Sequence, residues 1–293
     1  MTIFQAILLG LVQGLTEFIP VSSTAHLVFA ARVLNLYGGV DKTLQAEQTT
    51  ATIAVIQLGT LLAVLVYFAR DIVNITRAFI GDHIAWFRGQ TELGQPKLSR
   101  DAWLGWLVII GSLPVGVVGL LFKKHIEGTF TKNLWVIATM MIVVGVLMLI
   151  AEIVSKHERN MDQLRLGDAL AVGSAQVLAL IPGSSRSGST IMGGLFAGLN
   201  RETAARFSFL LSIPAIAASG LLELKEAIEK LPHGSYGSLT VATIVSGVVG
   251  YASIWFLLRY LRTHSTSLFI VYRVIVGGAI LAALAAGYVS ANI

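Results

Sequence analysis

Long apolar runs, separated by short polar stretches, make up most of the 293-residue chain. Each run approaches the roughly 20 residues that an α-helix needs to cross the hydrocarbon core of a bilayer. A soluble fold has no place to bury so many uncharged helices, so the pattern predicts an all-α polytopic membrane protein. The clearest runs, with at most one charge each, are residues 51–68, 102–122, 134–151, 239–258 and 268–289.

Two other apolar stretches are interrupted by a proline, Pro20 at what we term the first break and Pro182 at the second break. Proline lacks a backbone N–H group and clashes with the preceding turn, so a helix must end at each of them. Such short helices occur at membrane depth only where protein buries them or where they line a wet cavity. We therefore predict two re-entrant helical hairpins, formed by residues 3–19 with 24–36 and by residues 166–181 with 190–199.

The surroundings of the two breaks resemble each other. Gly10 and Gln13 are matched by Gly173 and Gln176, and a proline and a pair of serines follow in both stretches. This match indicates an internal repeat, in which each half holds one hairpin and three of six transmembrane helices. Because three is odd, the second half enters the membrane upside down. The prediction is an inverted-topology repeat, residues about 1–155 and 160–293, within one domain of residues 1–293.

The composition indicates that little of the chain faces water. Hydrophobic residues make up 55% and charged residues 13%, with a mean hydropathy of +0.77, whereas soluble domains carry about 25% charged residues. The chain has no cysteine, which excludes disulfides, thiolate catalysis and cysteine-ligated zinc.

The net charge of +5 does not indicate a nucleic-acid partner, because membrane proteins concentrate Lys and Arg in their cytoplasmic loops. On the predicted topology one side carries the larger share of Lys and Arg. That side includes residues 82–100, which we expect to form a cytoplasmic loop, and both termini then lie outside. The N-terminal segment lacks the features of a removable signal peptide.

The first break gathers groups that perform acid–base and nucleophilic chemistry. Gln13 and Glu17 are four residues apart and share one face of a helix. Ser22 or Ser23 is placed to cap the next helix, and His26 follows in its first turn. An ionisable residue within a membrane indicates a functional site, because burying its charge is costly. The alternative is that Glu17 and His26 pair only to stabilise the bend.

The second break, PGSSRSGST at residues 182–190, is dense in hydroxyl groups and glycine around Arg186. A helix N-terminus offers free N–H groups and a positive dipole end to a phosphate, and an arginine adds a forked donor for phosphate oxygens. The alternative is a flexible loop whose arginine reaches toward water. Arg186 has apolar helices on both sides, so we favour a buried phosphate clamp. Arg273, in the last apolar run, is expected to pair within the helix bundle.

These two motifs, QGLTEFIPVSSTAH at residues 13–26 and PGSSRSGST, closely resemble the signatures of the bacterial undecaprenyl-diphosphate phosphatase family, also known as the bacitracin-resistance family. Residues 57–59 (QLG) and 207–214 (FSFLLSIP) also resemble segments of that family. The resemblance covers almost the whole chain. It implies hydrolysis of undecaprenyl diphosphate to the monophosphate and phosphate, which recycles the lipid carrier of peptidoglycan synthesis and confers bacitracin resistance.

The resemblance also implies roles for particular residues and a setting for them. It implies a divalent cation, Mg²⁺ or Ca²⁺, a homodimer, and a site that opens to the outer face of the bacterial plasma (inner) membrane. Glu17 and Gln13 are the candidate metal ligands, although Gln13 brings no negative charge. By position, the catalytic residues are Glu17, Ser23, His26 and Arg186, and the phosphate-binding hydroxyls are those of Ser22, Ser185, Ser187 and Thr190.

Two questions stay open at the level of sequence. The nucleophile is Ser23, His26 or an activated water. The rival function is a transporter or flippase of polyprenyl phosphates, because carriers also use inverted repeats with broken helices. A carrier needs no nucleophile beside a base, and Ser23 next to His26 and Glu17 favours the enzyme.

Overall fold

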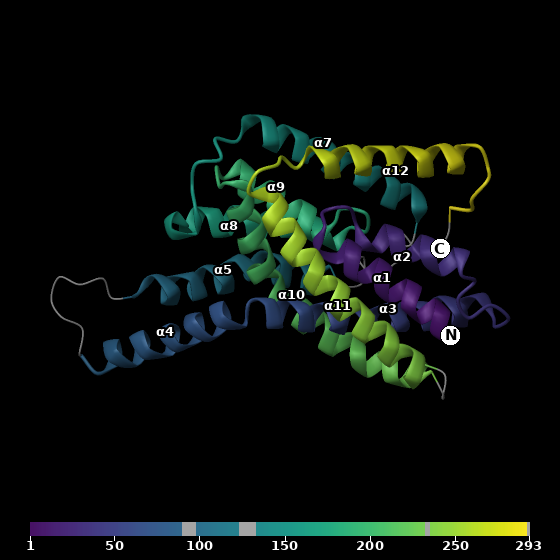
Figure 1. Ribbon diagram of the computed structural model, residues 1–293, viewed down its shortest axis with the longest axis horizontal. Coiled ribbons are helices and arrows are strands. Elements are labelled where there is room, and N and C mark those ends of the chain that lie inside the picture. Colours follow the sequence, from purple (N-terminus) through teal and green to yellow (C-terminus); the bar gives the residue numbers. More distant parts are fainter. Residues whose placement is uncertain (90–97, 123–132, 232–234, 292–293) are drawn as a thin grey trace.

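The computed structural model describes residues 1–89, 98–122, 133–231 and 235–291 of the chain, and within them the architecture is helical (Figure 1). In chain order the elements are α1 (Ile3–Phe18), α2 (Ser23–Val33), α3 (Lys42–Tyr67), α4 (Ala69–Phe87), α5 (Arg100–Leu121), α7 (Leu134–Val154), η2 (Met161–Gln163), α8 (Leu166–Gln176), η3 (Val177–Leu180), α9 (Arg186–Phe196), α10 (Arg201–Lys230), α11 (Tyr236–Leu261) and α12 (Ser267–Ala285).

Five of these helices, α3, α5, α7, α11 and α12, are long and apolar enough to cross a membrane. They coincide with the five apolar runs of the sequence, so that part of the prediction is confirmed. Their lengths follow from bilayer thickness, because a rise of about 1.5 Å per residue makes some 20 residues span roughly 30 Å. Both termini lie at the same end of the molecule (Figure 1).

Helices end at both breaks, as the prolines predict. The first break occupies residues 19–22, between α1 and α2, and the second break occupies residues 181–185, between η3 and α9. The helix expected at residues 190–199 begins at Arg186 instead, so that boundary was wrong. The serine and glycine residues after Arg186 form the first turn of α9 rather than a loop, because Ser185 caps the backbone of Gly188.

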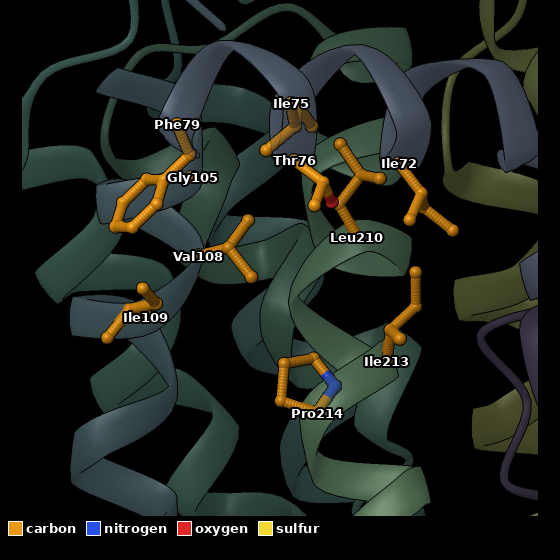
Figure 2. Close-up of a pocket in the computed structure, with 10 residues that line it drawn as sticks. All are labelled: Ile72, Ile75, Thr76, Phe79, Gly105, Val108, Ile109, Leu210, Ile213 and Pro214. Atoms are coloured by element: carbon orange, nitrogen blue, oxygen red, sulfur yellow. The ribbon is translucent and has the colours of Figure 1, made fainter. Parts of the chain in front are cut away.

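The predicted loop at residues 82–100 is also partly wrong, because α4 continues to Phe87. Ile72, Ile75 and Phe79 recur at helical spacing, and they pack toward α5 and α10 around a small apolar groove (Figure 2). In Figure 1, α4 and α5 lie side by side and extend away from the end that holds the termini. Residues 90–97 of the predicted loop lie outside the described residues.

Close helix contacts surround each broken pair. α1 packs along α11, and α8 packs against α5. A Cβ atom added to Gly10 of α1 would lie 2.5 Å from the carbonyl oxygen of Ala242, and one added to Gly173 of α8 would lie 2.1 Å from that of Gly111. Only glycine permits this backbone approach, which membrane helices use because lipid provides no hydrophobic force between them.

An aromatic cluster closes the core next to the first break. Phe18, the last residue of α1, packs edge-on against Phe209 of α10 at 5.3 Å between ring centroids, and the ring of Phe68 also packs edge-on against Phe209, at 6.3 Å. All three rings are buried. This packing holds the end of α1, and therefore Glu17, inside the bundle.

Candidate active site

Both breaks contain a serine with a positive φ angle directly before the next helix. Ser22 (φ 77°) and Ser185 (φ 67°) are the residues before α2 and α9, and both adopt the left-handed conformation that favours glycine. A serine held there carries a conformational cost, and such residues persist mainly at functional sites. The positions after them, Ser23 and Arg186, are therefore the matching first residues of two helices.

An ion pair joins the two breaks. Arg186 Nη2 donates to Glu17 Oε1 across 169 positions of sequence. The other carboxylate oxygen, Glu17 Oε2, accepts a hydrogen bond from Gln13 Nε2 at 3.1 Å, and the same amide lies 3.3 Å from Thr60 Oγ1 of α3. Gln13 and Glu17 are buried, so the carboxylate and the guanidinium neutralise each other where water is scarce. The structure therefore brings the two motifs together at this ion pair.

His26 has two well-formed hydrogen bonds. Its Nδ1 lies 2.7 Å from the carbonyl oxygen of Ser22, which can only accept, so Nδ1 carries a proton. Nε2 lies 2.7 Å from the hydroxyl of Tyr272 on α12, and the two rings stack at 5.6 Å. In the neutral ring Nε2 is therefore the acceptor of the hydrogen bond from the Tyr272 hydroxyl, and its role as a general base stays a prediction. Ser23 is half-buried one turn earlier on α2.

The second break is internally bonded. Ser185 Oγ accepts from the Gly188 amide at 3.2 Å and lies 3.2 Å from Ser187 Oγ. Ser187 in turn donates to the carbonyl oxygen of Ile19 in the first break at 3.4 Å. Thr190 Oγ1 lies 2.5 Å from Ser208 Oγ of α10. The hydroxyl of Thr190 thus fixes α9 to α10, and the phosphate-binding role of these hydroxyls stays a prediction.

Arg273 of α12 donates hydrogen bonds to both breaks. Its side chain is completely buried, and within the described residues its hydrogen bonds go to backbone carbonyl oxygens. Nη1 donates to Pro20 of the first break at 3.3 Å, and Nη2 donates to Gly183 and Ser184 of the second break at 3.0 and 2.9 Å. The expected pairing within the bundle is confirmed. Three of its acceptors are carbonyl groups at the breaks, where helices leave them free, and the other two are those of Met140 and Met141 in α7.

Several buried polar atoms at the breaks have no hydrogen-bond partner among the described residues. They are the hydroxyls of Ser22, Ser184 and Ser189 and both amide atoms of Gln176. Buried polar groups are normally bonded, so these atoms are donors and acceptors that a bound ligand could satisfy. A phosphate, with several acceptor oxygens, matches the hydroxyl donors.

The donor set at Glu17 fits a divalent cation only together with a substrate. One carboxylate and the free amide oxygen of Gln13 are hard oxygen ligands, and Mg²⁺ is commonly held by one or two carboxylates plus substrate phosphates. Among the described residues there is no group of three His, Asp or Glu side chains that could hold an ion without such help.

Sequence reasoning missed four contributors: Thr60, Ser208, Tyr272 and the bridging role of Arg273. Arg273 carried a signal, because it is the single charge in the run 268–289 and an intramembrane charge indicates function. Thr60, Ser208 and Tyr272 carried none, because a lone hydroxyl within an apolar helix is common.

Known proteins resemble the chain over its whole length. It is 52% identical to the undecaprenyl-diphosphatase of Syntrophobacter fumaroxidans, over 96% of this chain and 97% of that protein. It is 47% identical to the undecaprenyl-diphosphatases of Mycolicibacterium vanbaalenii and Chloroherpeton thalassium, over 99% of this chain and 100% of each of those proteins. Residues 6–279 match the family described as "Bacitracin resistance protein BacA". The chain, with the Glu17–Arg186 pair at the meeting of its two breaks, belongs to the bacitracin resistance protein BacA family.

Proposed function

We propose that this protein hydrolyses undecaprenyl diphosphate to undecaprenyl phosphate and inorganic phosphate. This recycles the lipid carrier of peptidoglycan synthesis and confers bacitracin resistance. The observation that carries the proposal is the buried pair of Glu17 and Arg186, which places a phosphate-binding cation beside a carboxylate inside an apolar helical bundle. The relatives' name, undecaprenyl-diphosphatase, gives the same activity.

The diphosphate binds between the two breaks, at the N-terminal ends of α2 and α9. Arg186 provides a forked donor, and the two helix ends provide free N–H groups and positive dipole ends. When the substrate arrives, its phosphate oxygens share the guanidinium with Glu17. The same donors stabilise the charge that develops on the transferred phosphoryl group, which is the main task in phosphoryl transfer.

Ser23 is our favoured nucleophile. Its Oγ attacks the terminal phosphorus, the anhydride bond to the bridging oxygen breaks, and undecaprenyl phosphate leaves. His26 Nε2 or Glu17 accepts the hydroxyl proton. Water then attacks the phosphoserine, releases inorganic phosphate and restores the hydroxyl. His26 or a water activated by it is the alternative nucleophile.

A divalent cation, Mg²⁺ or Ca²⁺, would be held by Glu17, the amide oxygen of Gln13 and the diphosphate. It would neutralise phosphate charge. The protein residues keep their own tasks, with Arg186 binding phosphate and Gln13 orienting Glu17 through the 3.1 Å hydrogen bond.

The chain is a multi-pass membrane protein, and we propose that it lies in the bacterial inner membrane as an inverted-topology repeat and forms a homodimer. α10 is the proposed sixth crossing, and the α1–α2 and α8–α9 pairs are the re-entrant hairpins. The matched contacts of α1 with α11 and of α8 with α5 support this arrangement. By the bias of Lys and Arg, both termini and the opening of the site face outward.

The test is phosphate release from undecaprenyl diphosphate by the purified protein in detergent. We expect turnover that Arg186→Ala lowers by about 10²–10³. Arg88→Ala is the matched control, because Arg88 is exposed at the end of α4, and it should retain full activity. Absence of phosphate release, with transport of polyprenyl phosphate across vesicles instead, would replace the enzyme by the flippase.

A further inference from the structure

A groove between α2 and α12 begins at His26. It has a volume of about 370 Å³, at the small end of the range for ligand pockets. Tyr272, Ile275, Ala279 and Ala283 lie three or four positions apart and give the groove one face of α12, and Phe29 contributes from α2.

The groove has one polar end and an apolar body. The hydrogen-bonded rings of His26 and Tyr272 form the polar end, and the rest of the lining consists of alanine, valine, isoleucine and phenylalanine side chains. A ligand that fits has a charged head near His26 and a hydrocarbon chain running away from it.

The matching place beside the second break is closed. α9 packs against α7, and its residues from Ser187 to Leu195 are all buried. On α2 only Ala25, Leu27 and Ala31 are buried. The opening is therefore specific to the half of the molecule that holds His26.

The groove is also open to lipid. α12 is apolar enough to span the membrane, and Ile275 on it is 64% exposed. The lining of the groove extends to Ala283 and Val289, close to the C-terminus, and both termini lie at one end of the molecule (Figure 1). The groove therefore occupies the half of the bilayer on the side of the termini. On the proposed orientation that half is the outer leaflet.

We propose that this groove binds the isoprenoid units nearest the diphosphate, with Tyr272 at the junction of head and chain. The proposal rests on the proposed function. A diphosphate held at Arg186 and processed by His26 must send its chain out past His26, and the α2–α12 groove begins there. The volume accommodates only the first few units, and the remaining chain lies in the bilayer. The α4–α5–α10 groove of Figure 2 is apolar too, but it contains no candidate site residue.

The first test measures binding without catalysis. The chain has no cysteine, so Ala279→Cys provides a unique thiol for a maleimide reagent in detergent. Undecaprenyl phosphate should slow labelling at least severalfold, whereas inorganic phosphate and phosphatidic acid should not. Ile109→Cys, in the groove of Figure 2, is the control and should be unaffected. Equal protection by phosphatidic acid, or equal protection of both thiols, would overturn the proposal in favour of an ordinary bilayer lipid.

The second test measures dependence on chain length. Ala279→Phe and Ala283→Phe fill the groove, so kcat/KM for undecaprenyl diphosphate should fall about tenfold while that for dimethylallyl diphosphate stays unchanged. Ile109→Phe should change neither. An equal loss with both substrates, with a shift from dimer to monomer, would assign the groove to a second copy and overturn the proposal. If the wild type hydrolyses neither substrate, the proposed function fails while the thiol test still decides the groove.

Discussion

The two breaks share a backbone but differ in how firmly the helix after each is held. Ser185 caps α9 with its side chain, whereas the buried hydroxyl of Ser22 caps nothing in α2. α9 is buried along most of its length, and α2 lies beside an open groove. The position that holds Glu17 in α1 holds Leu180 at the end of η3. The comparison shows that two breaks with similar backbones present different side chains: the second break leads into an enclosed helix that begins with Arg186, and the first break holds Glu17, Ser23 and His26 beside an open groove.

The largest effect is expected from removing metal, because only the first break has a carboxylate for it. A chelator should abolish phosphate release, and Mg²⁺ or Ca²⁺ should restore it. Gln13→Glu should keep activity and tighten metal binding, since it adds a charge. Full turnover in excess chelator would remove the metal from the proposal.

Mutation of the reactive groups should come next. Ser23→Ala or His26→Ala should lower turnover by about 10²–10⁴, while binding of undecaprenyl phosphate persists because Arg186 is untouched. Lipid binding and single-turnover hydrolysis on the same purified variants separate the two effects. Near-normal turnover in Ser23→Ala would exclude serine and leave His26 or water as the nucleophile.

Substitution of Arg186 in α9, directly after the second break, should affect substrate binding as well as turnover. Arg186→Ala should weaken binding and lower turnover together, the latter by about 10²–10³ as for loss of one charge-stabilising donor. Arg186→Lys should rescue little, because an ammonium cannot reproduce the forked contact. Unchanged binding in Arg186→Ala would contradict the assignment of the second break to phosphate.

The close helix contacts at Gly10 and Gly173 can be tested by measuring thermal stability. Gly173→Ala forces a methyl group against the Gly111 carbonyl, and overpacking of this kind costs about 1–3 kcal/mol. Thermal unfolding in detergent should show the loss, and Gly10→Ala should behave alike. Gly116→Ala is the matched control, because a Cβ there meets nothing within 4 Å. A control that destabilises equally would remove close helix approach as the cause.

The smallest effect is expected at Tyr272. Tyr272→Phe keeps the ring stacked on His26 but removes the hydrogen bond to Nε2, so kcat should change roughly two- to tenfold, as for one hydrogen bond. Affinity for undecaprenyl phosphate should stay unchanged. A loss of affinity without a change in kcat would show that the Tyr272 hydroxyl contacts the lipid and does not position His26.

Sequence alone located the five long apolar helices and the two breaks of this protein, but it missed α4. The thickness of a bilayer imposes a length on each apolar run, so α5 and α7 could be predicted from local sequence. Pro20 and Pro182 mark the two breaks, whereas Pro114 lies inside α5 and Pro214 inside α10, so a proline alone does not decide where a helix ends. The start of α9 was misplaced by four residues, because a Ser-Gly stretch reads as a loop until a cap and tertiary packing hold it in a helix.

Only the tertiary structure decided what meets at the breaks. Glu17 and Arg186 are 169 positions apart, and His26 and Tyr272 are 246 positions apart. No local period encodes such a distance. The partner of each residue is set by which helices pack together and how closely. Examples are the contact of Gly10 in α1 with α11 and that of Gly173 in α8 with α5. The groove beside His26 exists for the same reason, because α2 stays partly uncovered where α9 is enclosed.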